Sequence, residues 1–210
     1  MNPATPLTSK QLDALVENHP ATASCRGAVG EAIERLLKVF TSGGKLLVCG
    51  NGGSAADAEH IAGELMKGFM HPSTLDVETA ARLGPLLAAK LQRGLPVLPL
   101  TGFASFTTAW ANDCDRDFVF AQLVLTLGRR GDALLAISTS GNAVNVLHAA
   151  DAARAQGLQV LALTGESGGR LKSKADVCVC AAARETFRIQ ELHLPIYHAI
   201  CLSLEERLFG

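Results

Sequence analysis

The sequence has almost no net charge and no long apolar run. Its 210 residues include 19 Lys and Arg against 20 Asp and Glu, a formal net charge of −1. Domains that bind a nucleic-acid backbone usually show a basic excess or stripe, so we expect no nucleic-acid partner. No apolar run approaches the roughly 18–20 residues that cross a bilayer, so we expect no membrane partner. Residues 1–6 lack the basic start and apolar core of a signal peptide, which predicts a cytoplasmic protein.

The cysteines do not form a zinc-knuckle pattern. Cys178 and Cys180 alternate along a predicted strand and share a face, but no second pair accompanies them at metal-binding spacing. We therefore predict reduced thiols that pack as small hydrophobic side chains. The six are Cys25, Cys49, Cys114, Cys178, Cys180 and Cys201.

What the sequence does contain indicates one α/β domain over residues 1–210. Hydrophobic residues make up 48% and charged residues 19%, enough for a full core. An N-terminal helical segment within residues 1–40, interrupted near Pro20, precedes alternating apolar runs and helices. Such alternation is typical of a parallel sheet covered on both faces. The predicted strands are 46–49, 95–100, 133–138, 159–164 and 177–180, and the main predicted helices after the first segment are 55–69, 144–156 and 188–208.

Residues 68–95 do not fit the simple alternation and are interpreted as an inserted helical segment. Thr74 or Asp76 could cap a short helix that ends at Gly84, and Pro85 is well placed to start a second one. The leucines and alanines of this segment are expected to cover something apolar. The insertion could be an extra surface layer, a subunit contact, or a wall over the substrate.

The most informative stretch is residues 50–64. A glycine-rich turn, Gly50 to Ser54, follows the first strand and begins a helix, so backbone N–H groups and the Ser54 hydroxyl can bind an anion. One turn further on, His60 and Glu64 stand four residues apart and share a helix face. This layout suits a site that holds a phosphorylated molecule and performs acid–base or metal chemistry on it.

A second loop, Ser138-Thr139-Ser140-Gly141-Asn142, lies between a later strand and its helix. Its three consecutive hydroxyls suit a phosphate monoester, although a Ser/Thr-rich helix cap is common at such turns. In parallel sheets, ligands bind beyond the carboxyl ends of the strands, where the 50–54 and 101–105 loops also lie. Two hydroxyl-rich loops at one sheet edge favour the phosphate interpretation.

Residues 188–198 supply further candidates, among them Gln190 and His198. Pro195 inside this segment is expected to kink or locally unwind its helix. His60 and Glu64 could be metal ligands, an acid–base pair or a solvated surface pair, and either histidine could be a satisfied core side chain. The Gly50-x-Gly52-x-x-Ala55 pattern also matches a dinucleotide fingerprint, but no carboxylate ends the second strand to hold a ribose.

Together these motifs resemble the SIS (sugar isomerase) domain proteins and, within them, the sedoheptulose 7-phosphate (phosphoheptose) isomerases. The resemblance rests on Gly50 to Ser54 with His60 and Glu64, on Asn112-Asp113, on Ser138 to Asn142, and on Arg188 to Glu191 with His198. It covers nearly the whole chain apart from residues 68–95. The family pattern has Ser where this chain has Ala143.

The resemblance implies a three-layer, flavodoxin-like sandwich with a five-stranded parallel sheet, assembled as a homotetramer with active sites at subunit contacts. It implies conversion of sedoheptulose 7-phosphate to D-glycero-D-manno-heptose 7-phosphate. Glu64 and His198 would move the proton between C1 and C2 through an enediol. One zinc ion per subunit would be bound by His60, Glu64, Gln190 and His198. The substrate would contact Asn51, Gly52, Gly53, Ser54, Asn112, Asp113, Ser138, Thr139, Ser140 and Gln190.

Two other functions stay open at this point. A non-catalytic SIS protein could bind a phosphosugar as a sensor or bind a replication initiator, and an isomerase could act on a different phosphosugar. The joint presence of His60, Glu64, Gln190 and His198 favours an enzyme. Ala143 and the 68–95 insertion bear on substrate recognition rather than on proton transfer.

Overall fold

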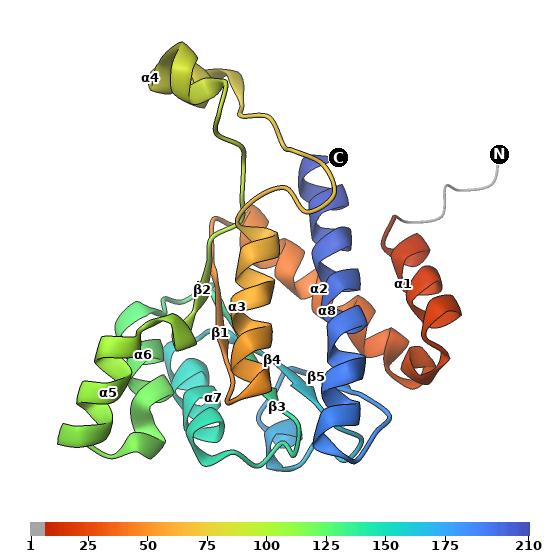
Figure 1. Ribbon diagram of the computed structural model, residues 1–210, viewed down its shortest axis with the longest axis vertical. Coiled ribbons are helices and arrows are strands. Elements are labelled where there is room, and N and C mark those ends of the chain that lie inside the picture. Colours follow the sequence, from red (N-terminus) through yellow and green to blue (C-terminus); the bar gives the residue numbers. More distant parts are fainter. Residues whose placement is uncertain (1–6) are drawn as a thin grey trace.

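The computed structural model describes residues 7–210, so residues 1–6 of the expected N-terminal segment lie outside it. Helices and strands alternate along the chain as expected (Figure 1). The helices are α1 (Leu7–Asn18), α2 (Arg26–Thr41), α3 (Gly53–Leu65), α4 (Val77–Ala88), α5 (Ala104–Asp113), α6 (Val119–Leu127), α7 (Val144–Gln156) and α8 (Thr186–Phe209). Short 3-10 turns are η1 (Pro20–Cys25), η2 (Leu100–Gly102), η3 (Arg116–Phe118) and η4 (Arg170–Ser173).

The strands form one parallel sheet in the order β2-β1-β3-β4-β5. They are β1 (Leu46–Cys49), β2 (Val97–Pro99), β3 (Ala133–Ser138), β4 (Gln159–Thr164) and β5 (Val177–Cys180). Four of these match the predicted ranges, and β2 is shorter than the predicted 95–100. Pro96 and Pro99 have no N–H to donate, and Leu100 already begins η2, which limits the second strand.

Helices cover both faces of the sheet, which confirms the three-layer α/β sandwich (Figure 1). Leu46 and Val48 of β1 pack into a core with α2, α3 and α8, whereas Leu47 and Cys49 pack into a second core with α6 and α7. The alternation follows from the strand period of two residues, and both faces are apolar because both are covered. No helix within residues 7–210 is long and apolar enough to cross a membrane.

The strand order creates a topological switch point at β1. The chain leaves β1 toward β2 on one side of the sheet and later returns to β3 on the other side. The loops that follow β1 and β3 therefore diverge at the carboxyl edge and leave a crevice between them, the usual place for a ligand in such sheets. Both predicted phosphate loops begin there.

The six cysteines are free thiols, as predicted. Cys25, Cys49 and Cys201 are buried, and burial raises the pKa of the Cys25 thiol to about 11. The Sγ atoms of Cys178 and Cys180 lie 3.6 Å apart on β5. These surroundings fit packing side chains, apart from Cys114, which is exposed.

Helix α8 runs from Thr186 to Phe209 through Pro195, so the expected local unwinding is wrong. Proline removes one N–H and crowds the preceding turn, which ordinarily breaks a helix. Here buried side chains on both sides of Pro195 pack into the core, among them Ile189, Ile196 and Ile200. This packing holds the helix together across the missing hydrogen bond.

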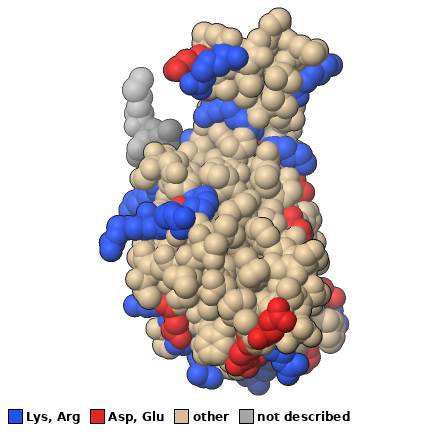
Figure 2. Space-filling model, turned by 90° about the vertical axis from the view of Figure 1, so that its left-hand side faces the viewer, with Lys and Arg blue, Asp and Glu red and all other residues tan. Residues whose placement is uncertain are grey.

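Residues 68–95 include an arm, α4 and its flanking residues, that stands apart from the body as a separate lobe at the top of Figures 1 and 2, whereas Phe69 and Leu95 near the two ends of the segment pack on the body. The Asp76 side chain caps α4 by accepting the Thr79 N–H at 2.8 Å, and Gly84 breaks the helical conformation with a φ of 77°, as predicted. Within this chain α4 covers no apolar surface, so contact of its apolar side chains with another subunit or with the substrate stays a prediction. None of the residues of α4 is buried, and Val77 and Leu86 are 88% and 74% exposed.

Candidate active site

A polar pocket of about 300 Å³ lies at the switch point of the sheet. Its walls come from the turn after β1, the loop after β3 and the first turns of α8. The structure thus brings two predicted phosphate loops into one cavity. The predicted substrate residues that line it are Asn51, Gly52, Gly53, Ser54, Ser138, Thr139, Ser140 and Gln190.

Two glycines shape the turn after β1. Gly52 has a φ of 57°, a left-handed conformation that favours glycine. A Cβ on Gly53 would collide with the side-chain amide of Gln190, so the absence of a side chain lets α8 approach the start of α3. Because α3 begins at the pocket, its N–H groups and the positive end of its dipole favour an anion there.

Hydrogen bonds fix the other wall of the pocket. The Ser140 hydroxyl accepts the N–H of Asn142 at 3.1 Å, and Asn142 Oδ1 accepts the N–H of Arg170 at 3.0 Å. Asn51 and Asn145 exchange two side-chain amide hydrogen bonds, each 2.9 Å long, across the two loops. Sequence reasoning missed Asn145, although an amide in the first turn of the helix after the loop was an available signal.

His60 and Glu64 face one another on α3, as predicted. His60 Nε2 lies 3.0 Å from Glu64 Oε1, and Lys67 Nζ lies 3.2 Å from the other carboxylate oxygen. The His60 side chain is 41% exposed and that of Glu64 is 17% exposed. The carboxylate is therefore half-buried and held between two nitrogen groups.

Tyr197 and Asp57 hold His60 at Nδ1, the ring nitrogen that does not face Glu64. The Tyr197 hydroxyl lies 2.9 Å from His60 Nδ1 and donates to Asp57 Oδ1 at 3.4 Å. Burial raises the pKa of Asp57, although Tyr197 and His60 oppose the shift. Burial and the neighbouring Asp57 also raise the pKa of Tyr197. Sequence reasoning missed both residues; Asp57 lies three residues before His60 on the same helix face, whereas Tyr197 comes from a distant segment.

His198 lies beside this cluster. Its ring centroid is 5.1 Å from that of His60 and 5.4 Å from that of Phe69. Its Nε2 atom is buried and has no hydrogen-bond partner within residues 7–210. Desolvation, helped by His60 and opposed by Glu64, lowers the pKa of His198. The imidazole is therefore neutral near neutral pH and has a free ring nitrogen.

The four predicted zinc ligands are only partly assembled. His60, Glu64 and His198 lie together, whereas Gln190 lines the phosphate pocket against Gly53. No three His, Cys, Asp or Glu side chains of the described chain are arranged as a metal-binding group. The donor types still suit zinc, since imidazole nitrogens and a carboxylate are common ligands. The unpartnered Nε2 of His198 is the observation that fits a cation.

Asn112 and Asp113 are not brought to the pocket. They end α5, where both are exposed, and Asn112 Nδ2 donates to Asp113 Oδ1 at 2.7 Å. Neither residue lines the cavity beyond β1 and β3. Contact of Asn112 and Asp113 with the same substrate therefore stays a prediction.

Comparison with known proteins agrees with this geometry. The SIS domain model matches residues 12–93 and 71–165, two stretches that overlap in the arm. A phosphoheptose isomerase of Thiobacillus denitrificans is 45% identical over 178 residues, 83% of this chain and 81% of that protein. One from Trichlorobacter lovleyi is 37% identical over 204 residues, 96% and 94% of the two chains. The structure of phosphoheptose isomerase from Neisseria gonorrhoeae aligns with a TM-score of 0.72 at 34% identity, covering 93% of this chain and 94% of that chain.

The chain belongs to the SIS domain family, whose model spans most of it. Within that family, the relatives that share 37–45% of its residues over most of their length are phosphoheptose isomerases.

Proposed function

We propose that this protein is an aldose–ketose isomerase that converts sedoheptulose 7-phosphate to D-glycero-D-manno-heptose 7-phosphate through an enediol. The observation that carries the proposal is a pocket of about 300 Å³, lined by hydroxyl side chains, at the start of α3, with His60 and Glu64 further along the same helix. Ser54 and His60 are six residues apart, about 9 Å along the helix at 1.5 Å per residue. An extended sugar held by its terminal phosphate therefore places its carbonyl end beside His60 and Glu64.

Glu64 and His198 are the proposed acid–base pair. Isomerisation moves one proton between C1 and C2, so it needs a base near the carbon and an acid near the carbonyl oxygen. The Glu64 carboxylate, fixed by His60 and Lys67, accepts the carbon-bound proton. Neutral His198, with its free Nε2, exchanges the proton with the substrate oxygens. Phe69 packs on the His198 ring from the loop after α3.

The direct test is an NMR time course with sedoheptulose 7-phosphate in D₂O. The wild type should form the aldose and incorporate deuterium at the carbon that receives the proton. Glu64→Gln keeps the shape but removes the base, so turnover should fall by at least roughly 10²–10⁴-fold. Glu59→Gln is the matched control, because Glu59 lies on the same helix and accepts from Thr101 instead.

The outcomes separate the alternatives. If Glu64→Gln isomerises like the wild type, the base lies elsewhere, with His198 the first candidate. If the wild type converts only another phosphosugar, the reaction class stands and the proposed substrate is wrong. If it binds phosphosugars but converts none, the protein is a non-catalytic SIS binding protein.

We also propose one zinc ion per subunit, held by His60, Glu64, Gln190 and His198. The support is the buried, unpartnered Nε2 of His198, whose ring lies 5.1 Å from that of His60, and the His60 Nε2 and Glu64 Oε1 atoms 3.0 Å apart. A bound zinc ion would polarise the substrate carbonyl. Elemental analysis should find about one zinc per wild-type chain and much less in His60→Ala or His198→Ala, with His148→Ala as a control on α7. Metal-free wild type that stays fully active in chelator would contradict the zinc proposal and leave the acid–base roles intact.

We further propose a homotetramer with active sites at subunit contacts, working in the cytoplasm. Asn112 and Asp113 lie exposed and away from the pocket, where they could reach the site of a second copy. Figure 2 shows a face whose charged side chains lie mostly toward its edges, as subunit interfaces commonly have. Six free cysteines fit a reducing compartment. Light scattering should give four chains per particle, and a monomer with full activity would overturn the shared-site proposal.

A further inference from the structure

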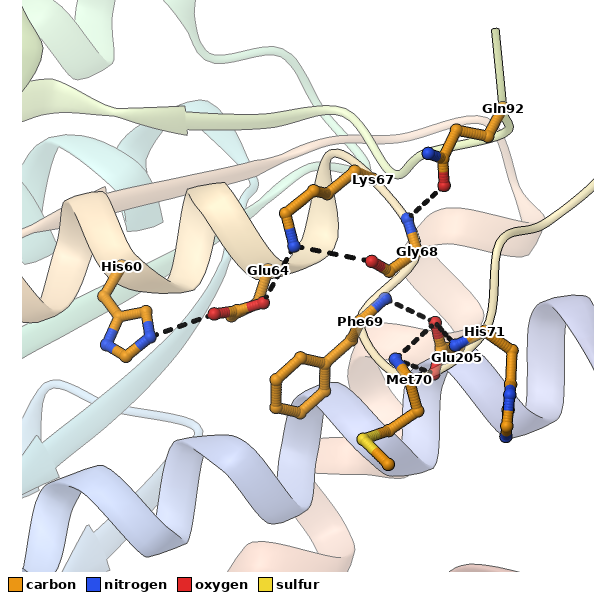
Figure 3. Close-up of polar contacts among 9 residues, drawn as sticks. All are labelled: His60, Glu64, Lys67, Gly68, Phe69, Met70, His71, Gln92 and Glu205. Carbon is orange, nitrogen blue, oxygen red and sulfur yellow. Dashed lines mark hydrogen bonds and ion pairs between the residues drawn. The ribbon is translucent and has the colours of Figure 1, made fainter. Parts of the chain in front are cut away.

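A buried carboxylate on α8 holds the loop that leaves α3. Glu205 is 7% exposed and accepts the backbone N–H groups of three consecutive residues (Figure 3). Its Oε1 lies 2.6 Å from the Phe69 nitrogen and 3.5 Å from that of His71, and its Oε2 lies 3.0 Å from that of Met70. The loop therefore wraps around one side-chain carboxylate.

This arrangement is a strong anchor for a loop. A carboxylate is seldom buried unless its charge is compensated, and hydrogen bonds from N–H groups to an ionised acceptor are among the stronger ones. The anchor acts on backbone atoms, so it fixes the path of residues 69–71 whatever their side chains are. Gln92 adds a second tie, because its Oε1 accepts the Gly68 N–H at 2.9 Å.

The anchored loop touches both proposed acid–base residues. The Phe69 ring packs on His198 with a centroid distance of 5.4 Å and a tilt of 45°. Lys67, two residues earlier, pairs with Glu64 at 3.2 Å. Figure 3 shows Glu205 on the far side of the loop from Glu64, with Phe69 between the two. Glu205 itself thus reaches the site only through the loop.

We propose that Glu205 is a positioning residue for the isomerisation: it fixes the loop after α3 so that Phe69 holds the His198 imidazole and Lys67 holds the Glu64 carboxylate. The inference rests on the proposed function and adds a residue to it. Without the anchor the loop moves, the Phe69 ring leaves His198, and the two proton-transfer groups lose their mutual alignment. The phosphate pocket is built from other loops and keeps its shape.

The test compares Glu205→Gln with Glu206→Gln. The first keeps the size of the side chain but removes its charge and turns an N–H₂ group toward the three N–H donors. The second is the matched control, since Glu206 is the next residue of α8 and accepts from Gln11 of α1 at 2.7 Å. For Glu205→Gln, kcat should fall by about 10- to 100-fold, because small misplacements of catalytic groups cost that much, while KM changes little. Glu206→Gln should keep both values.

Two readouts do not depend on activity. The ring protons of His198 are shifted in NMR spectra by the Phe69 ring, and Glu205→Gln should move them to their positions in Phe69→Leu. Hydrogen exchange should quicken at the amides of Phe69, Met70 and His71 only. If Glu205 acts through Phe69, the double variant should be no slower than the slower single variant.

The result that overturns the inference is a Glu205→Gln protein with unchanged kcat and unchanged His198 resonances. An equal loss of kcat in Glu205→Gln and Glu206→Gln would also overturn it, since the effect would then be general to α8. A wild type that isomerises no phosphosugar would instead overturn the proposed function, and the NMR and exchange readouts would still test the anchor.

Discussion

The hydroxyl oxygen of Tyr197 lies 2.9 Å from Nδ1 of His60. The same hydroxyl donates to Asp57 Oδ1 at 3.4 Å, and in that arrangement its oxygen accepts the Nδ1–H of His60. The other ring nitrogen, Nε2, then faces Glu64 Oε1 across 3.0 Å. Two lone-pair acceptors attract one another at that distance only with a proton or a cation between them. The Tyr197 hydroxyl therefore helps to determine which ring nitrogen of His60 carries the proton, and so leaves the lone pair of Nε2 directed toward Glu64.

Tyr197→Phe should disturb the site without disturbing the core. Tyr197 is 2% exposed and its ring stays in place in the variant, but His60 loses the partner of Nδ1. Supporting contacts of this kind typically change metal affinity or activity by about 10- to 100-fold, and we expect a loss in that range. Metal content and kcat/KM measured on the same preparation check this. Wild-type values for both would show that His60 needs no partner at Nδ1.

Asn145→Ala should weaken binding of phosphorylated sugars modestly. The variant removes both hydrogen bonds that hold Asn51 at the pocket. Each such neutral bond contributes about 0.5–1.5 kcal/mol; because Asn145 does not itself line the pocket, only part of the loss reaches binding, and we expect roughly a 2- to 10-fold loss of affinity. Ser140→Ala, which removes a proposed donor to the charged phosphate itself, should cost about 1.5–3 kcal/mol, or roughly 10- to 150-fold.

Calorimetric titration with a phosphorylated sugar and its unphosphorylated analogue distinguishes the two variants. Binding of the analogue should be nearly unaffected in both proteins. Equal losses for the two sugars would show that these loops do not recognise phosphate.

Features set by local sequence could be predicted well. β1, β3, β4 and β5 are short apolar runs bounded by turns, and their buried surroundings agree with that pattern. The phosphate loops follow from strand-to-turn-to-helix order, and the carboxyl ends of neighbouring parallel strands must meet at one edge. His60 and Glu64 share a face because a helix has 3.6 residues per turn.

Features that depend on contacts between distant segments could not be predicted from the sequence. The Tyr197–His60 contact joins residues 137 apart in the sequence, and the Glu205–Phe69 contact joins residues 136 apart. The residue types of Tyr197 and Glu205 do not indicate a supporting role at the site, because a tyrosine in an amphipathic helix usually packs in the core and a glutamate usually faces solvent. The prediction that the helix unwinds at Pro195 was wrong for the same reason, because the packing that keeps α8 helical comes from the rest of the fold.

Removing the arm should leave the fold intact. The Ser73 carbonyl accepts the Arg93 N–H at 2.9 Å, so the two ends of the arm already meet, and α4 buries none of its residues. Replacing residues 75–91 with a short linker should change the free energy of unfolding by no more than about 0.5 kcal/mol, as surface changes do.

The same deletion should change assembly or substrate preference, because an apolar helix exposed in the single chain needs a covering surface. Urea unfolding, light scattering and kcat/KM for phosphosugars of different length measure the three effects. A loss of several kcal/mol would show that the arm packs on the body. Unchanged assembly and kinetics would leave the arm without a role in either.

His193 should make the protein less stable in mild acid. It is 0% exposed on α8, its Nε2 donates to the Thr164 carbonyl at 3.2 Å, and burial lowers its pKa from 6.5 to about 4. Between pH 6.5 and about 4, His193 is protonated in the unfolded chain but not in the folded chain. Lowering the pH in that window therefore stabilises the unfolded chain relative to the folded one. The stability is fully present above pH 6.5 and is lost progressively as the pH falls toward 4, by up to about 3 kcal/mol at 1.36 kcal/mol per pKa unit.

His193→Gln tests this assignment, because it keeps an N–H donor for Thr164 but cannot titrate. Urea unfolding at several pH values between 7.5 and 4.5 measures the free energy of unfolding of both proteins. The wild type should lose more stability than the variant as the pH falls, although the variant starts lower from imperfect packing. Parallel curves would mean that His193 does not cause the acid sensitivity, since a difference in packing shifts the whole curve whereas a difference in proton binding changes its slope.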